Sequence, residues 1–204
     1  MFLLASREKQ FLLEVARRAL TAAVHGHDAL QGLRSDAPWA APGGAFVSLH
    51  RRARLRGCVG QIGSKQPLVY VVAYCARAAA LEDPRFDPVQ PDELAEIEIE
   101  LSILSPLAEI RPGEIEVGRH GLLVSRGAQR GVLLPQVATQ FRWTAAHFLE
   151  QTCMKAGFER DAWSQPGTRL EAFTAEVFAE AEFQGVGGDE SSPTHADPDY
   201  SNST

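Results

Sequence analysis

The sequence has no long hydrophobic run. No apolar stretch reaches the ~18 residues that a membrane-spanning helix needs. The apolar residues near the start have no basic segment before them and no extended hydrophobic segment after them, so they do not resemble a signal peptide. We therefore expect a cytoplasmic protein that does not insert into a membrane.

The sequence is also poor in cysteine and has no metal-binding spacing. Its three cysteines, Cys58, Cys75 and Cys153, are odd in number and far apart, which matches neither a zinc motif nor a disulfide framework. The six histidines show no ligand spacing either. We expect reduced thiols, with Cys75 and Cys153 in the core, and no metal or cofactor.

An excess of positive charge is absent as well. The formal net charge is −6, and the segment 184–204 contains four acidic residues and no Lys or Arg, which leaves −2 for the rest. This balance argues against general nucleic-acid binding, which depends on cationic contacts to phosphate. The basic run Arg51, Arg52, Arg54 and Arg56 is interpreted as a solvated hairpin tip, because no aromatic stacking residues are interleaved with it.

The hydrophobic patterns predict an α+β fold, with antiparallel or mixed sheets flanked by helices in two interlocked lobes. Residues 1–183 are expected to form one domain, with two subdomains as an alternative, and 184–204 a disordered or loosely ordered acidic tail. The row Glu96, Glu98 and Glu100 is interpreted as the solvent face of a strand. The expected elements are a helix from a Ser6 cap to about 26, a strand at 45–49, a buried helix at 68–81, a strand at 96–104, a hairpin of 122–124 and 132–134 around a loop at 126–131, a helix capped by Thr144 and ending near 157, and a last strand at 173–178.

The segment Leu55-Arg56-Gly57-Cys58-Val59-Gly60, the LRGCVG motif, sets a cysteine between two glycines beside an arginine. Glycine lets the backbone approach another group closely, and a neighbouring guanidinium favours the thiolate form of a cysteine. The motif therefore suggests a reactive thiol or an anion site. The alternative is a small, half-buried thiol that fills space under a glycine turn.

Several blocks occur in the order found in one known family, and the resemblance as a whole covers about residues 6–182. They are 44–47 (GAFV), 55–60 (LRGCVG), 80–86 (ALEDPRF), 98–104 (EIELSIL), 118–122 (GRHGL) and 133–137 (LLPQV), followed by Trp143 and Phe148-Leu149. With these blocks the chain resembles the AMMECR domain family, in particular its prokaryotic branch. One departure is Arg142, at a position where the resemblance implies glycine.

The resemblance implies partners more firmly than it implies a reaction. Members of that branch are often encoded beside a Memo-like protein and a radical S-adenosylmethionine (SAM) enzyme as the AmmeMemoRadiSam system, in which this chain would be protein A. We therefore expect protein–protein interaction with a Memo-like protein and a radical SAM enzyme.

The candidate site residues are gathered around the motif. Arg56 and Arg85 could together hold a small anion, because each guanidinium offers a fork suited to carboxylate or phosphate. Cys58 and Glu82 are the candidate catalytic residues, and we hypothesise that they share one cleft with the two arginines. The structural alternative is that Arg56 pairs with Glu82 or Asp83. The remaining candidate ligand-binding residues are Gly57, Gly60 and Gln136.

Three functions remain open at this point. The first is an accessory protein of the two-partner system that presents an Arg/Cys-lined cleft to a small anionic substrate or intermediate. The second is an enzyme with Cys58 as nucleophile, although no base with a recognisable spacing accompanies that cysteine. The third is a small-molecule or nucleotide-binding module without chemistry of its own.

Overall fold

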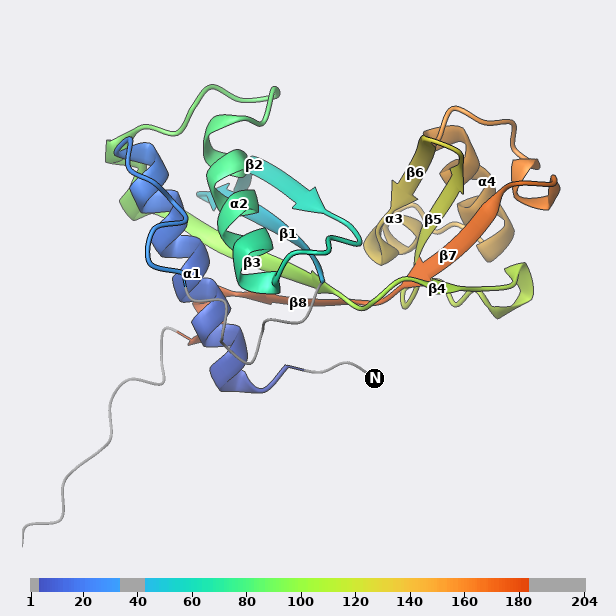
Figure 1. Cartoon of the computed structure of the whole chain (residues 1–204), viewed down its shortest axis with the longest axis horizontal. Coiled ribbons are helices and arrows are strands. Elements are labelled where there is room, and N and C mark those ends of the chain that lie inside the picture. Colours follow the sequence, from blue (N-terminus) through green and yellow to red (C-terminus); the bar gives the residue numbers. More distant parts are fainter. Residues whose placement is uncertain (1–3, 34–42, 184–204) are drawn as a thin grey trace, which may run out of the picture.

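The chain folds into two lobes that lie side by side (Figure 1). The computed structural model describes residues 4–33 and 43–183 of the 204. Each lobe has a four-stranded antiparallel sheet and its own cluster of buried apolar side chains. The α+β class predicted from the sequence is confirmed, and every strand pair in the described part of the chain is antiparallel. The acidic tail expected at 184–204 lies outside the described residues.

The larger lobe is a two-layer arrangement of helices on a sheet with the strand order β2-β1-β3-β8. The two long helices cover one face of this sheet (Figure 1). In β3 the alternation of isoleucine and leucine with acidic residues turns the apolar side chains toward those helices, as the period of two predicted. Its elements are α1 (Ser6–Val24), β1 (Gly44–Arg51), β2 (Arg54–Gln61), α2 (Leu68–Leu81), β3 (Ile97–Leu104) and β8 (Ala175–Ala179), with the short 3-10 helix η1 (Pro91–Glu96) before β3 and η4 (Glu180–Phe183) after β8.

The smaller lobe has the strand order β4-β7-β5-β6. Phe148 and Leu149 of its longer helix pack against the sheet residues Leu122 and Val124. Thr144 caps this helix by accepting a hydrogen bond from the backbone N–H of His147 at 3.3 Å, as predicted. The elements are β4 (Ala108–Glu109), β5 (Gly121–Arg126), β6 (Gln129–Leu133), α3 (Pro135–Gln140), α4 (Ala145–Lys155) and β7 (Arg169–Phe173), with short 3-10 helices η2 (Pro112–Glu114) and η3 (Ala162–Ser164).

The chain crosses between the lobes twice, after β3 and again between β7 and β8 (Figure 1). The two crossings are tied together, because the N–H of Ser105 donates to the carbonyl of Thr174 and the N–H of Thr174 donates to the Ser105 hydroxyl, each at 2.9 Å. The prediction of a single strand at 173–178 is therefore wrong. The segment is split at Thr174 because Phe173 packs in the smaller lobe, against Gly121, while Phe178 is buried in the core of the larger one.

Several predicted boundaries change for local reasons. Ser6 is the first helical residue rather than the cap: Ala5 holds the cap position, and its N–H donates to the Glu8 carboxylate at 2.6 Å. The loop expected at 126–131 shrinks to a two-residue turn, with Gly127 at φ +60°. Directly after the second hairpin strand, Pro135 opens the helix α3, where its missing N–H costs nothing.

No helix in the described ranges combines the length and the apolar character needed to cross a membrane. The buried helix predicted at 68–81 is observed as α2, and Cys75 on it and Cys153 on α4 are both buried, as predicted. Burial raises the pKa of the Cys75 thiol to about 12. These two thiols therefore belong to the cores and not to a site.

Candidate functional site

The LRGCVG motif lies on β2, an edge strand, and both of its glycines sit in close contacts. A Cβ atom on Gly57 would lie 2.1 Å from the carbonyl oxygen of Ala79 on α2. A Cβ atom on Gly60 would lie 2.2 Å from the ring of Phe46 on β1. Both glycines therefore allow close packing of this strand, one against the helix and one under an aromatic ring. Their predicted ligand-binding role stays a prediction.

At Cys58, side chains from the loop after α2 form hydrogen bonds with the backbone along the free edge of β2. The N–H of Cys58 donates to the Asp83 carboxylate at 2.8 Å, and Arg85 donates to the Cys58 carbonyl at 3.2 Å. Arg85 also forms an ion pair with Asp83 at 2.6 Å. The Arg85 guanidinium, with help from the backbone N–H groups of Cys58 and Arg85, holds the pKa of the buried Asp83 carboxyl well below its usual range. The predicted neighbourhood of Cys58 and Arg85 is observed, through the backbone of Cys58.

Arg56 lies at a bulge of β2, because Leu55 pairs with His50 and Gly57 pairs with Leu49, which leaves Arg56 without a cross-strand partner. Its guanidinium binds the Glu93 carboxylate through two bonds, at 2.9 and 2.8 Å, and the Asp87 carbonyl at 2.9 Å. This fork lowers the pKa of Glu93 to about 2.

The sequence-based alternative, in which Arg56 pairs with Glu82 or Asp83, is therefore wrong about the partner. Glu82 instead pairs with Arg77 at the surface of α2, at 2.6 Å. The structure thus brings Arg56, Cys58 and Arg85 to the same strand edge but does not bring Glu82 to them. Because each of the two arginines is already neutralised by a buried carboxylate, they are not a free pair of cations.

The Cys58 thiol is half-buried and points to the sheet face opposite the helices, since Gly57 next to it points toward α2. The Ser48 hydroxyl, directly across on β1, donates to its sulfur at 3.4 Å. The strand register puts Glu100 beside Ser48 and puts the pair His50 and Glu98 in the next row of the same face. Cys58 therefore has hydroxyl, imidazole and carboxylate groups on its own sheet face. The Ser48 hydroxyl is within hydrogen-bond distance of its sulfur, and the Arg85 guanidinium also interacts with the thiol from the strand edge.

This grouping was missed because it comes from strand pairing. The sequence assigns Glu98 and Glu100 to a solvated face, and His50 only precedes the basic run. No spacing along the chain connects these three residues with Cys58. The alternation of apolar and polar residues in 47–50 was the available signal, because it places Ser48 and His50 on one face and Val47 and Leu49 on the other.

A cavity of about 490 Å³ lies between the lobes, next to the end of the motif. It extends from Gly60 of the motif to the wall of the smaller sheet, and β2 runs toward that lobe in Figure 1. Arg130 on β6 lines it, is exposed, and has no hydrogen bond or ion pair within the described ranges. The lining residues are Gly60, Gln61, Ile62, Gly63, Ser64, Leu123, Arg130 and Val132.

Gln136 does not line this cavity. It is exposed on the first turn of α3, and its amide makes no hydrogen bond to the part of the chain that the structure describes. Its predicted ligand-binding role stays a prediction.

The basic run is largely neutralised by acids of η1. Arg51 binds Glu93 at 2.9 Å and Glu96 at 3.0 Å, and Arg52 binds Glu96 at 2.7 Å. With Arg56 also bound to Glu93, Arg54 is the member of the run that has no ion pair among residues 4–33 and 43–183. Little positive charge is left here for phosphate.

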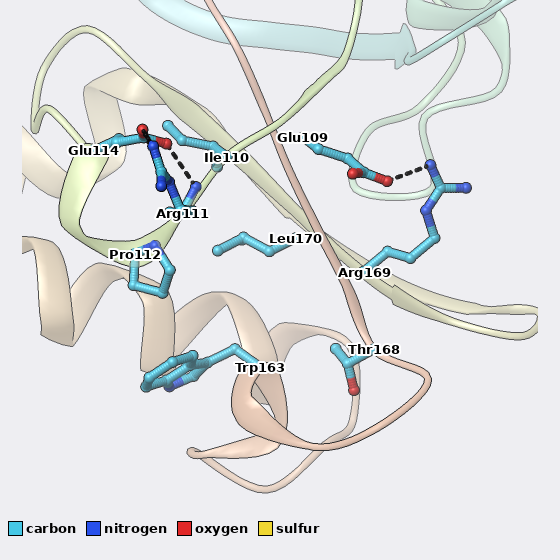
Figure 2. A pocket seen from close by; sticks show the side chains of 9 residues that line it. All are labelled: Glu109, Ile110, Arg111, Pro112, Glu114, Trp163, Thr168, Arg169 and Leu170. Carbon is cyan, nitrogen blue, oxygen red and sulfur yellow. Dashed lines mark hydrogen bonds and ion pairs between the residues drawn. The ribbon is translucent and has the colours of Figure 1, made fainter.

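A larger depression, about 580 Å³, lies in the smaller lobe, away from the motif. Figure 2 shows Trp163 and Pro112 on one wall, and two ion pairs on the rim, Arg111 with Glu114 and Arg169 with Glu109. Its charged residues thus pair with one another. Within the described ranges, no group of three or more His, Cys, Asp and Glu side chains could hold a metal ion.

Comparison with known proteins gives the family. The AMMECR1 family profile matches residues 13–178. A protein of Methanothermobacter thermautotrophicus is 40% identical over 186 residues, covering 87% of this chain and 96% of its own, and Protein TK0174 of Thermococcus kodakarensis is 42% identical over 185 residues, covering 84% and 89%. The crystal structure of uncharacterized protein PH0010 from Pyrococcus horikoshii is similar with a TM-score of 0.72 at 36% identity, covering 83% of this chain and 90% of that one. The chain belongs to the AMMECR1 family.

Proposed function

We propose that this chain is an accessory protein, protein A of an AmmeMemoRadiSam system. In this role it binds a Memo-like protein and a radical SAM enzyme. It presents the space beside the LRGCVG motif to a small anionic substrate or intermediate. The family resemblance supports the choice of partners, and the cavity beside the motif supports the choice of ligand position.

The observation that carries the proposal is the cavity between the lobes. Its volume of about 490 Å³ suits a small ligand. It begins at Gly60 of the motif, and its cation, Arg130, is not paired with an acid within the described ranges. Since Arg56 and Arg85 already bind Glu93 and Asp83, Arg130 replaces them as the proposed anion-binding residue.

The surroundings of Cys58 favour an accessory role, in which the chain presents a ligand, over catalysis by the thiol. A nucleophilic thiol needs a base within hydrogen-bond distance, or a nearby free cation that favours the thiolate. The Ser48 hydroxyl, which contacts the Cys58 sulfur, is no base at neutral pH, and the Arg85 guanidinium beside the thiol is already paired with Asp83. Both candidate arginines are neutralised, so neither supplies a free positive charge.

Co-production of the three proteins tests the proposal. We expect the chain to co-purify with the Memo-like protein and the radical enzyme. Arg130→Ala should leave folding intact and weaken retention of phosphate or pyrophosphate by the complex at least tenfold. Arg54→Ala is the matched control, because Arg54 is likewise exposed and has no ion pair among the described residues, but lies outside the cavity. Absence of any complex at micromolar concentrations, with and without phosphate, would refute the accessory role.

The second candidate is an enzyme with Cys58 as nucleophile, and the shared face of Cys58, Ser48, His50 and Glu100 favours it. The rate at which iodoacetamide alkylates Cys58 distinguishes this enzyme from the accessory protein. An activated thiol should react at least tenfold faster than N-acetylcysteine, and the fast phase should vanish in Cys58→Ser. A rate equal to or below that of N-acetylcysteine excludes this mechanism.

A further inference from the structure

The connection between α3 and α4 carries two stacked aromatic rings, Phe141 and Trp143, with Arg142 between them in the chain. Together with His147 on the first turn of α4, these residues are here called the aromatic corner. The Phe141 and Trp143 rings stack with centroids 5.1 Å apart and planes 18° from parallel. The His147 ring meets Trp143 edge-on, with centroids 5.2 Å apart. Phe141 is nevertheless 59% exposed, the highest value among the large apolar side chains exposed in the described part of the chain.

The backbone of the corner is strained at Arg142. This residue follows the end of α3 and has φ +54°, a left-handed conformation that glycine adopts freely and other residues adopt at a cost. The turn closes the helix with two hydrogen bonds, from the N–H of Arg142 to Thr139 at 3.1 Å and from the N–H of Trp143 to Ala138 at 2.8 Å. This is the helix-ending arrangement in which glycine is the usual residue.

The backbone of Arg142 closes the helix, but its side chain has no partner in the described part of the chain. The Arg142 guanidinium is exposed and has no hydrogen bond or ion pair to residues 4–33 or 43–183. Glu150, one turn beyond His147 on α4, already pairs with His147 and Arg160 at 3.5 Å each. No charged residue lies on α3 itself. The corner is thus a cationic and aromatic surface on which no acid of the described ranges pairs with Arg142.

We propose that the aromatic corner is a docking surface for an acidic segment of a partner protein. A carboxylate of the partner pairs with Arg142, and an apolar side chain beside it packs on the exposed face of Phe141. Arginine and aromatic residues are the types that carry most binding energy at protein interfaces. Stacking on Trp143, whose ring His147 meets edge-on, holds the Phe141 ring in place before binding. The surface lies outside the cavity between the lobes, so it adds a contact that the proposed function does not assign.

Two variants separate a binding role from a structural one. Arg142→Gly relieves the left-handed strain, and we expect the Tm of the full chain to rise by about 3 °C. The same variant should lose binding, so stability and binding change in opposite directions. Phe141→Ala tests the apolar contact, and Arg54→Ala is the matched control, an exposed arginine without an ion pair in the described ranges.

The binding probe is the capped peptide Glu-Leu-Asp-Leu-Glu, followed by NMR at the indole N–H of Trp143. We expect the wild-type chain and Arg54→Ala to show the same saturable shift, and Arg142→Gly and Phe141→Ala to bind at least tenfold more weakly. The peptide with lysine at the three acidic positions should have no effect.

Three results overturn the proposal. They are no shift of the wild-type indole at millimolar peptide, equal binding by Arg142→Gly, and a shift with oligouridylate but not with the acidic peptide, which would assign the corner to RNA. None of these depends on the Memo-like protein or the radical enzyme, so the docking surface and the accessory role can fail separately.

Discussion

At the scale of single residues, the two glycines of the LRGCVG motif differ in what they contact. Gly57 faces the backbone of α2, where the carbonyl oxygen of Ala79 cannot move without disturbing the helix. Gly60 faces the ring of Phe46, a side chain that can shift. Backbone and side-chain neighbours differ in how much a new methyl group costs. The motif therefore has a structural requirement that is separate from any ligand.

We predict that Gly57→Ala destabilises the protein more than Gly60→Ala. The added methyl group at Gly57 would lie 2.1 Å from the oxygen of Ala79, so α2 and β2 must separate, at a cost of about 2 to 3 kcal/mol. Urea unfolding measures this difference. Gly113→Ala is the control, because no atom lies within 4 Å of the Cβ position there. Equal stability of Gly57→Ala and Gly113→Ala would contradict the close packing.

At the scale of elements, the loop between α2 and β3 acts as a partner for the edge strand β2. Asp83 and Arg85 bind the backbone of Cys58, and Glu93 on η1 binds Arg56 and Arg51. These charged side chains replace the hydrogen bonds that a further strand would supply. An exposed strand edge is prone to pairing with other chains, so this arrangement also protects β2.

Glu93 makes this loop sensitive to acid. Its pKa in the folded protein is about 2, below the ordinary value of 4.5, chiefly because Arg56 donates two hydrogen bonds to its carboxylate. The ionised Glu93 carboxylate therefore makes its full contribution to the free energy of unfolding above pH 4.5, and this contribution is lost as the pH falls toward 2. Its size is on the order of 3 kcal/mol at most.

We predict that Glu93→Gln lowers the free energy of unfolding at pH 7 and flattens its decline between pH 4.5 and 2. Urea titrations at several pH values measure both effects. Glu114→Gln, which removes an exposed partner of Arg111, is the control and should change little. A variant at Glu93 with the same acid dependence as the wild type would show that this carboxylate does not control acid stability.

The elements that the sequence predicted correctly are those with a strong local pattern. The alternation in β3, the apolar surface of α2 and the Thr144 cap of α4 are all local signals, and all three are observed. The errors concern long-range choices. Nothing near Thr174 shows that Phe173 and Phe178 enter different cores, and nothing near Arg56 indicates Glu93, 37 residues away, as its partner. The grouping of Cys58, Ser48, His50 and Glu100 likewise depends on register.

At the scale of the whole molecule, the C-terminal strand returns to the lobe in which the chain began. β8 pairs with β3, and Phe178 is buried in the core of the larger lobe, while the adjacent strand β7 belongs to the smaller one. The lobes are connected by two crossings and separated by a polar cavity, and their buried clusters share no residue. A loss of packing in one core should therefore lower the local stability of that lobe before it lowers that of the other.

A matched pair of variants tests this independence. Phe178→Ala removes a ring that is 1% exposed in the larger lobe, and Phe148→Ala removes one that is fully buried in the smaller lobe. Each should cost about 3 to 5 kcal/mol. Hydrogen exchange followed by mass spectrometry should show protection falling mainly in β1 and β3 for the first variant and mainly in β5 and β6 for the second. If both variants reduce protection equally in both lobes, the molecule opens as one unit, and the cavity between the lobes could not change shape by movement of one lobe alone.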